Sequence, residues 1–321
     1  MAFLAPSVIV IALGREAVFG CLSRRFSRNS RRAQRDGAFV AELLASVPVR
    51  VGQKWWLHKE HPDTRFAIGD RQRSWDMGTV VDVQAEGFSV ARSAATVVAE
   101  EVWVPMPVQE NASDLLLGAQ SRLRCIEWEQ MTPGIMQRTR PSASDSGDCY
   151  LLSRALAPGE VIDFFISHSW DDDAAAKYQR LEEVANAFSE IHGRYPTFWL
   201  DKACINQSSI SDGLRVLPVN IMACTQVLVL SGPSYASRLW CVWELFVLFA
   251  FAPEEAAMRT VYLPLQTGID TLDQLRHFDA MAARCYDPNE QTRLQRVITA
   301  VGVDEFNQRI RLWAAQFQGS S

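Results

Sequence analysis

The fold is decided by Gly232-Pro-Ser-Tyr-Ala-Ser-Arg-Leu-Trp-Cys-Val-Trp-Glu-Leu-Phe246 and the apolar residues that follow it. Residues 239–252 read LWCVWELFVLFAFA, and Glu244 is their single charge. This run is too short to span a bilayer, so it predicts a buried core helix. Helical spacing predicts that Glu244 shares a face with Trp240, Trp243, Val247, Leu248 and Phe251. The expected result is a partly desolvated carboxylate with a raised pKa, which is either functional or held by a nearby Arg, Lys or backbone N–H.

The sequence around this helix predicts alternating strands and helices. Short apolar runs predict strands at 161–166, 196–200, 226–230 and 259–264, and helices are expected at 174–192, where Gly193 ends the pattern, and at 210–223. This alternation predicts a parallel sheet with helices on both faces, and ligands bind such sheets at the carboxyl ends of the strands. The loops 167–173, 201–209 and 231–239 are expected at that edge, which Glu244 can face from the second turn of its helix.

Three motifs in this region resemble the Toll/interleukin-1 receptor (TIR) domain family. They are Phe165-Ile-Ser167, Trp199-Leu-Asp201, and Gly232-Pro-Ser-Tyr235 followed by Trp240-Cys-Val-Trp-Glu-Leu245. Residues 199–207, WLDKACINQ, are also similar to a segment of fungal heterokaryon-incompatibility domains. The resemblance covers roughly residues 161–265. It implies a flavodoxin-like α/β fold.

The family resemblance implies two alternative functions in signalling or defence, including innate immunity. Some TIR domains cleave NAD as a substrate, with no further cofactor, and the Glu of their W-C-x-x-E motif is catalytic; it corresponds to Glu244. A carboxylate there would stabilise the oxocarbenium-like centre formed when the nicotinamide–ribose bond breaks. Other TIR domains are non-enzymatic scaffolds that self-associate. The resemblance implies that the loop 201–209 both closes the site and packs against a neighbouring domain.

The candidate substrate-binding residues come from the three loops and from the Glu244 helix: Ser167, His168, Trp170, Asp201, Lys202, Tyr235 and, on the helix, Trp240. Trp240 lies one helical turn before Glu244 and could wall a nicotinamide pocket. His168 is either a general acid/base or a turn residue, Trp170 either covers the crevice or packs on a helix, and Lys202 either lies near phosphates or is solvated. Asp201 could orient its loop by a bond to the backbone. Plant-type TIR domains read S-F-R-G-E-D after the first strand, whereas this chain reads S-H-S-W-D-D at 167–172. The positive charge is missing here, and Asp171, Asp172 and Asp173 would repel a pyrophosphate.

Other constellations exclude several classes of function. Neither G-x-G-x-x-G nor G-x-x-x-x-G-K-[ST] occurs, and the seven cysteines contain no C-x-x-C pair. We therefore expect no metal site and a reducing compartment, with Cys204 and Cys241 as core thiols. Seven arginines and one glutamate give residues 1–35 a charge of +6, which leaves −11 on the rest of a chain with net charge −5. The negative charge of the chain after residue 35 argues against nucleic-acid binding.

The domain organisation is predicted from composition. Residues 1–44 are predicted to be a basic tail without a transmembrane span. It is a transit peptide, a peripheral membrane anchor or a disordered segment, so the protein is expected in the cytoplasm or in an organelle. Residues 45–110 resemble, weakly, a Tudor-like small β-barrel. Its aromatic residues could cage a methylated cation but more often form a core: Trp55, Trp75, Phe88 and Trp103. Residues 111–158 are predicted as a linker and 159–321 as the α/β domain. Helices near 272–282, 291–301 and 305–317 complete it, with an ambiguous fifth strand at 283–286.

Overall fold

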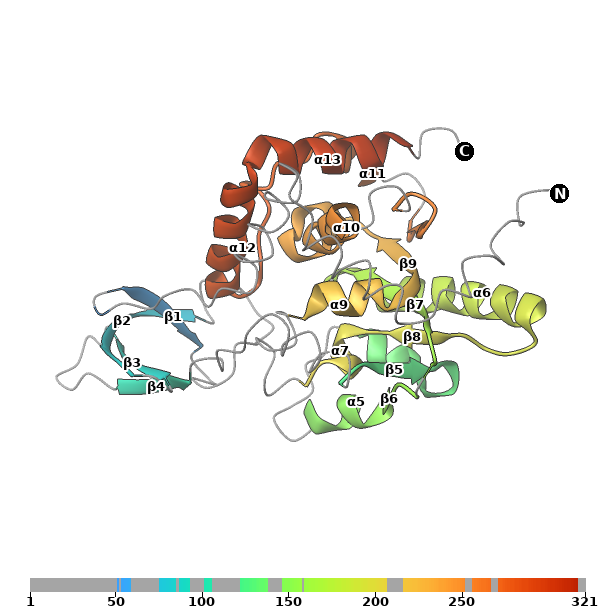
Figure 1. Cartoon of the computed structure of the whole chain (residues 1–321), viewed down its shortest axis with the longest axis horizontal. Helices are drawn as coiled ribbons and strands as arrows, with labels where there is room; N and C mark the ends of the chain where they lie inside the picture. Colours follow the sequence, from blue (N-terminus) through green and yellow to red (C-terminus); the bar gives the residue numbers. More distant parts are fainter. Residues whose placement is uncertain are drawn as a thin grey trace.

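A computed structural model describes residue 51 and the ranges 53–58, 75–84, 87–92, 101–105, 122–137, 146–157, 159–206, 216–251, 256–266 and 271–316. These residues form two sheets, one of four strands and one of six, and helices accompany the larger one (Figure 1). The predicted tail at 1–44 lies outside the described residues. Within the described ranges, no helix is long and apolar enough to cross a membrane.

The six-stranded sheet has the order β10-β9-β7-β8-β5-β6. Four of its strands run parallel to one another: the edge strand β10 (Thr260–Pro264), then β9 (Cys224–Ser231), β7 (Ile162–His168) and β8 (Thr197–Trp199). In chain order, these four strands are arranged 2-1-3-4. β5 (Arg124–Glu127) pairs antiparallel with β8, and β6 (Arg154–Ala155) pairs antiparallel with β5. The expected α/β class is therefore confirmed, with a sheet that is mixed rather than wholly parallel.

Helices connect the parallel strands as the periodicity predicts. α6 (Ala174–His192) follows β7; the Asp173 side chain caps it and Gly193, with φ of 69°, ends it in the left-handed conformation. α9 (Leu217–Met222) precedes β9, and α10 (Leu239–Phe251) follows it. Three further helices complete the chain: α11 (Thr271–Arg276), α12 (Pro288–Val301) and α13 (Val303–Gln316).

β7 and β9 are buried on both faces over most of their length, and their alternate side chains divide between two cores. Phe165, Val227 and Val229 belong to the core that contains the apolar residues of α9, α10, α12 and α13. Phe164 and Leu228 belong to the core that contains the apolar residues of α6. Because strand side chains alternate between faces, consecutive residues of β7 enter different cores.

Three predicted elements differ from the structure. The stretch expected as a polar loop after β8 begins with a buried helical turn, α7 (Asp201–Cys204), because Ala203 and Lys202 pack inward. α11 stops at Arg276, well short of the expected 282, and residues 277–283 form turns and irregular backbone. The ambiguous fifth strand is reduced to an isolated bridge between Arg284 and Arg238.

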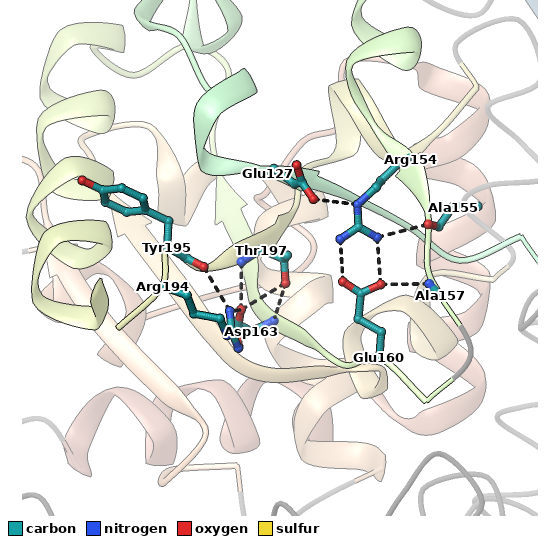
Figure 2. A network of polar contacts seen from close by, with 9 residues as sticks. All are labelled: Glu127, Arg154, Ala155, Ala157, Glu160, Asp163, Arg194, Tyr195 and Thr197. Carbon is teal, nitrogen blue, oxygen red and sulfur yellow. Dashed lines mark hydrogen bonds and ion pairs between the residues drawn. The ribbon is translucent and has the colours of Figure 1, made fainter. Parts of the chain in front are cut away.

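Part of the predicted linker 111–158 belongs to the larger sheet. The range 111–158 contains the strands β5 and β6, which pair with the sheet, and the helix α5 (Ser146–Leu152). Cys125 and Ile126 of β5 are fully buried. Arg154 holds this addition in place, because its guanidinium bonds to Glu127 of β5 and to Glu160, which precedes β7 (Figure 2). The four-residue strand R-C-I-E is too short to stand out from its polar surroundings, so composition alone misses it.

Figure 2 also shows how the amino ends of β7 and β8 are joined. Asp163 of β7 accepts hydrogen bonds from the backbone N–H and the hydroxyl of Thr197 on β8, at 2.8 and 3.1 Å. Arg194 pairs with both oxygens of the same carboxylate at 2.8 and 2.9 Å. This ion pair fixes the register at the end of the sheet opposite to the loops that were predicted to form the site.

The smaller sheet is an antiparallel meander of β1 (Lys54–His58), β2 (Trp75–Val83), β3 (Gly87–Arg92) and β4 (Glu101–Pro105). These strands lie in residues 45–110, where the sequence predicts a small β-barrel-like unit, whereas closure into a barrel stays a prediction. Phe88 is buried in the core of this sheet and Trp55 packs edge-on against it, with ring centroids 4.8 Å apart. The side chains of Trp75 and Trp103, the other members of the predicted aromatic cage, lie outside the described residues.

Candidate functional site

Glu244 lies with Ser167 and Tyr235 on the α10 side of the larger sheet, near the carboxyl end of β7. The Ser167 hydroxyl donates to Glu244 Oε2 at 2.6 Å, and Ser167 Oγ lies 2.7 Å from Tyr235 OH. Glu244 is 4% exposed and the other two residues are fully buried. β7 therefore meets the turn after β9 and the helix α10 that follows this turn, and these segments bring the three polar side chains into one buried cluster.

Burial raises the pKa of the Glu244 carboxyl well above its usual range, as the sequence predicted. Hydrogen bonds to Ser167 and Trp240 oppose this rise, and the negative charge of Asp201 adds to it. Among the described residues, no Lys or Arg forms an ion pair with Glu244, so the predicted alternative of a paired glutamate is not found there. The carboxyl is consequently a buried acid whose ionisation is costly, which is a property of many functional carboxyls.

The two indoles that were predicted beside Glu244 have different environments. Trp240 is half-buried and hydrogen-bonds to the carboxyl. Trp243 is fully buried in the core and stacks on Phe246 and on Phe306 of α13. Successive side chains of a helix point about 100° apart. Trp243 therefore points into the core, while Trp240, one turn before Glu244, lies on the same side of the helix as the acid.

A second polar cluster is centred on Asp201, at the start of α7. Asp201 Oδ2 accepts a hydrogen bond from the Trp170 indole at 2.7 Å. Asp201 Oδ1 accepts one from the Lys202 backbone N–H at 2.7 Å and lies 3.4 Å from His168 Nε2. The predicted bond between the Asp201 side chain and its own loop is thus present. Trp170 thus connects the loop after β7 to the first residues of helix α7.

Lys202 is neither solvated nor free to meet a phosphate in this arrangement. Its side chain is buried, its ammonium donates to the Gln137 carbonyl, and it lies over the Trp170 ring at 4.5 Å from the centroid. Burial lowers the pKa of Lys202, and the nearby Asp201 charge partly offsets that effect. The contact with Gln137 comes from the stretch that was predicted as a linker, so no pattern local to Lys202 could have indicated it.

Burial also sets the protonation of the other members of the Asp201 cluster. It lowers the pKa of His168 in spite of the neighbouring Asp201, so the imidazole is neutral at neutral pH. Burial alone would raise the pKa of Asp201, but the contacts with His168, Lys202 and Trp170 outweigh this effect, so the pKa is lowered. An ionised Asp201 accepts from His168, which assigns the ring proton to Nε2 and leaves Nδ1 as an acceptor.

The three consecutive aspartates, which were expected to repel a pyrophosphate, each have a partner within the fold. Asp171 lies 3.3 Å from the Arg238 guanidinium. Asp172 accepts from the backbone N–H and the hydroxyl of Ser234, at 2.9 and 2.8 Å, and Asp173 caps α6. The negative charge of this loop is therefore partly compensated by groups that the sequence motif did not indicate.

Lys177 is a buried cation that the sequence analysis missed. It is fully buried in the first turns of α6, and its ammonium donates to the Ser169 carbonyl at 2.9 Å. Burial, together with the charge of Lys202, lowers its pKa to about 8, and the charge of Asp172 opposes this change. Its position among the apolar residues on the inner face of α6 was the available signal, since Lys177 precedes Leu181 by one turn.

Cys241 is buried in the core and Cys204 is partly buried against both cores, as expected of core thiols. Burial raises the pKa of Cys204 to about 12 and that of Cys241 well above its usual range, so neither is a reactive thiolate. All six cysteines in the described part of the chain are free. In the same residues, no group of three or more His, Cys, Asp or Glu side chains is arranged to hold a metal ion.

Comparisons of the chain with models of protein families, with curated proteins and with solved structures found no match.

Proposed function

We propose that the larger domain is a TIR-like, flavodoxin-like unit that cleaves the nicotinamide–ribose bond of NAD, with Glu244 as its catalytic carboxylate. The strand order 2-1-3-4 supports the flavodoxin-like assignment, because that family has the order 2-1-3-4-5. The observation that carries the catalytic role is Glu244 itself: a buried acid beside the half-buried Trp240, with no ion-pair partner in the described residues.

Glu244 would act in its ionised form. Breaking the nicotinamide–ribose bond leaves positive charge on the ribose, and a carboxylate in a poorly solvated site stabilises that charge more strongly than it would in water. Because Glu244 is only 4% exposed, the substrate reaches it only if a neighbour moves. Trp240 is the half-buried neighbour whose rotation would uncover the carboxylate and offer an aromatic face to nicotinamide.

The test is nicotinamide release from NAD by the purified full chain and by Glu244→Gln. The variant keeps size and hydrogen bonding but removes the charge. Loss of one preorganised electrostatic contact of roughly 3 kcal/mol predicts a decrease of about a hundredfold or more in turnover. Glu290→Gln is the matched control, because Glu290 is a partly buried glutamate on α12, ion-paired with Arg293. Equal turnover in the wild type and in Glu244→Gln would refute the catalytic assignment.

The closed state of the Glu244 cluster favours a second candidate, a non-enzymatic module that self-associates in signalling. In that case Ser167, Tyr235 and Glu244 only join β7 to α10, and no substrate enters. Light scattering and nicotinamide release over the same range of protein concentrations separate the two candidates. Assembly without any release, in a chain whose Glu244→Gln variant assembles equally well, would favour the scaffold. A role in innate immunity is part of either proposal.

A further inference from the structure

Glu244, Ser167 and Tyr235 form a chain of hydrogen bonds that ends on a backbone carbonyl. Glu244 Oε2 lies 2.6 Å from Ser167 Oγ, which lies 2.7 Å from Tyr235 OH, and Tyr235 OH lies 3.4 Å from the Cys241 carbonyl oxygen. Ser167 and Tyr235 are fully buried and Glu244 nearly so. In this state bulk water does not reach the two hydroxyls, so the chain must supply their hydrogen bonds itself.

The chain can be satisfied in two directions, because each hydroxyl both donates and accepts. When Glu244 is ionised, Tyr235 donates to Ser167 and Ser167 donates to the carboxylate. When Glu244 is protonated, it can donate to Ser167, Ser167 to Tyr235, and Tyr235 to the Cys241 carbonyl. Burial raises the pKa of Tyr235 well above its usual range, so the phenol keeps its hydrogen in both states.

We propose that Ser167 and Tyr235 are positioning residues, which form a reversible hydrogen-bond relay that keeps buried Glu244 satisfied whether it is protonated or ionised. The two hydroxyls only rotate, and the proton that Glu244 gains or loses exchanges with solvent. This role is an alternative to the expectation that Ser167 and Tyr235 bind substrate, which stays a prediction. Its importance for catalysis rests on the proposed function, because that function needs an ionised Glu244, whereas the relay itself does not depend on NAD.

The relay explains why this acid is compatible with a core position. A buried polar group that loses its partner is strongly destabilising, whereas a chain of hydrogen bonds polarises its members and strengthens each bond. Replacement of either hydroxyl would leave one protonation state with an unsatisfied group. The relay therefore predicts that Tyr235 responds to the charge of Glu244, although Ser167 lies between them.

Infrared difference spectroscopy of the full chain tests this response without any substrate. The C=O band of protonated Glu244 is identified as the band that Glu244→Gln removes, and the ring C–O band of Tyr235 as the band that Tyr235→Phe removes. If the relay exists, both bands should change with pH at the same midpoint, and the Tyr235 band should no longer change with pH in Glu244→Gln. Tyr178→Phe is the control, because Tyr178 stacks on Trp128 on the α6 side.

Ser167→Ala tests the middle of the relay. Without the serine hydroxyl, the Tyr235 band should stop responding, and Glu244 should become a roughly tenfold weaker acid, since it loses a charge-assisted hydrogen bond. Ser167→Thr, which keeps a hydroxyl, should restore the response. If Ser167→Ala does not fold, as judged by circular dichroism, the Glu244→Gln experiment decides alone.

Two results would overturn the relay: a Tyr235 band that is constant through the Glu244 titration, or one that still responds in Ser167→Ala. These results are independent of NAD cleavage. A coupled titration in a protein that releases no nicotinamide would leave the relay standing and refute the enzymatic proposal, and the reverse combination would refute only the relay.

Discussion

Ser167 and His168 are consecutive residues at the carboxyl end of β7, yet they belong to two different polar clusters. Ser167 Oγ lies 2.6 Å from Glu244 on the α10 side, and His168 Nε2 lies 3.4 Å from Asp201 at the start of α7. Strand side chains alternate between the two faces of a sheet, so one strand end supplies both clusters. The Cys241 thiol, which contacts the His168 carbonyl at 3.4 Å, joins α10 to the same strand end.

Gly232 is predicted to be intolerant of any side chain. A Cβ added to it would lie 2.3 Å from Asp172 Cγ and 2.5 Å from Oδ2. Because Asp172 is held by Ser234, Gly232→Ala should lower the free energy of unfolding by roughly 1–3 kcal/mol, as overpacking does. Gly134→Ala is the control, since its Cβ would meet only Thr132 Oγ1, at 3.7 Å. Equal urea midpoints for both variants would contradict the prediction.

Asp173 is predicted to stabilise α6 through its side-chain cap, which accepts from the Ala176 backbone N–H at 2.7 Å. Asp173→Ala should cost about 1 kcal/mol of unfolding free energy, measured by urea denaturation. Asp173→Ser keeps a capping oxygen and should remain close to the wild type. If the alanine and serine variants are equally destabilised, the effect comes from the lost charge and not from the cap.

Glu244 is predicted to make the stability of the wild type fall as pH rises. Its folded pKa is raised above the ordinary value of 4.5, so between these two values the folded chain holds a proton that the unfolded chain has lost. Stability therefore decreases with pH in that window, and Glu244→Gln lacks this decrease. Thermal unfolding of both proteins from pH 4 to 9, a range of about five units around that window, measures the difference. Parallel stability curves would show that the pKa of Glu244 is not raised.

His168 is predicted to act in the opposite direction. Burial lowers its folded pKa below the ordinary value of 6.5, so as pH falls through that value the unfolded chain takes up a proton that the folded chain does not. The wild type should lose stability on the acid side of 6.5, and His168→Gln, which keeps a nitrogen donor for Asp201, should lose less. Chemical denaturation at two pH values on either side of 6.5 compares the two proteins. An equal acid-side loss in both would place the effect on other groups.

Local sequence was sufficient to predict the main parallel strands and the longest helix of the larger domain. The apolar runs predicted β7, β9 and β10 to within about two residues, and the 3.6-residue periodicity gave α6 with its Gly193 stop. The burial of Glu244 followed from the apolar residues around it on α10. These properties depend on residues within a few positions of one another, so they can be read along the chain.

The partners of the polar residues were decided only by the tertiary structure. The sequence contained Asp171, Asp172 and Asp173 as a block of charge, but Arg238 and Ser234, which contact the first two, lie more than sixty residues away. Likewise, β5 joined the sheet and Lys202 reached Gln137 across segments whose periodicity does not specify pairing. A hydrogen bond or ion pair depends on distances of about 3 Å between groups that only the packed sheet brings together, whereas a helix or strand depends on its own repeat.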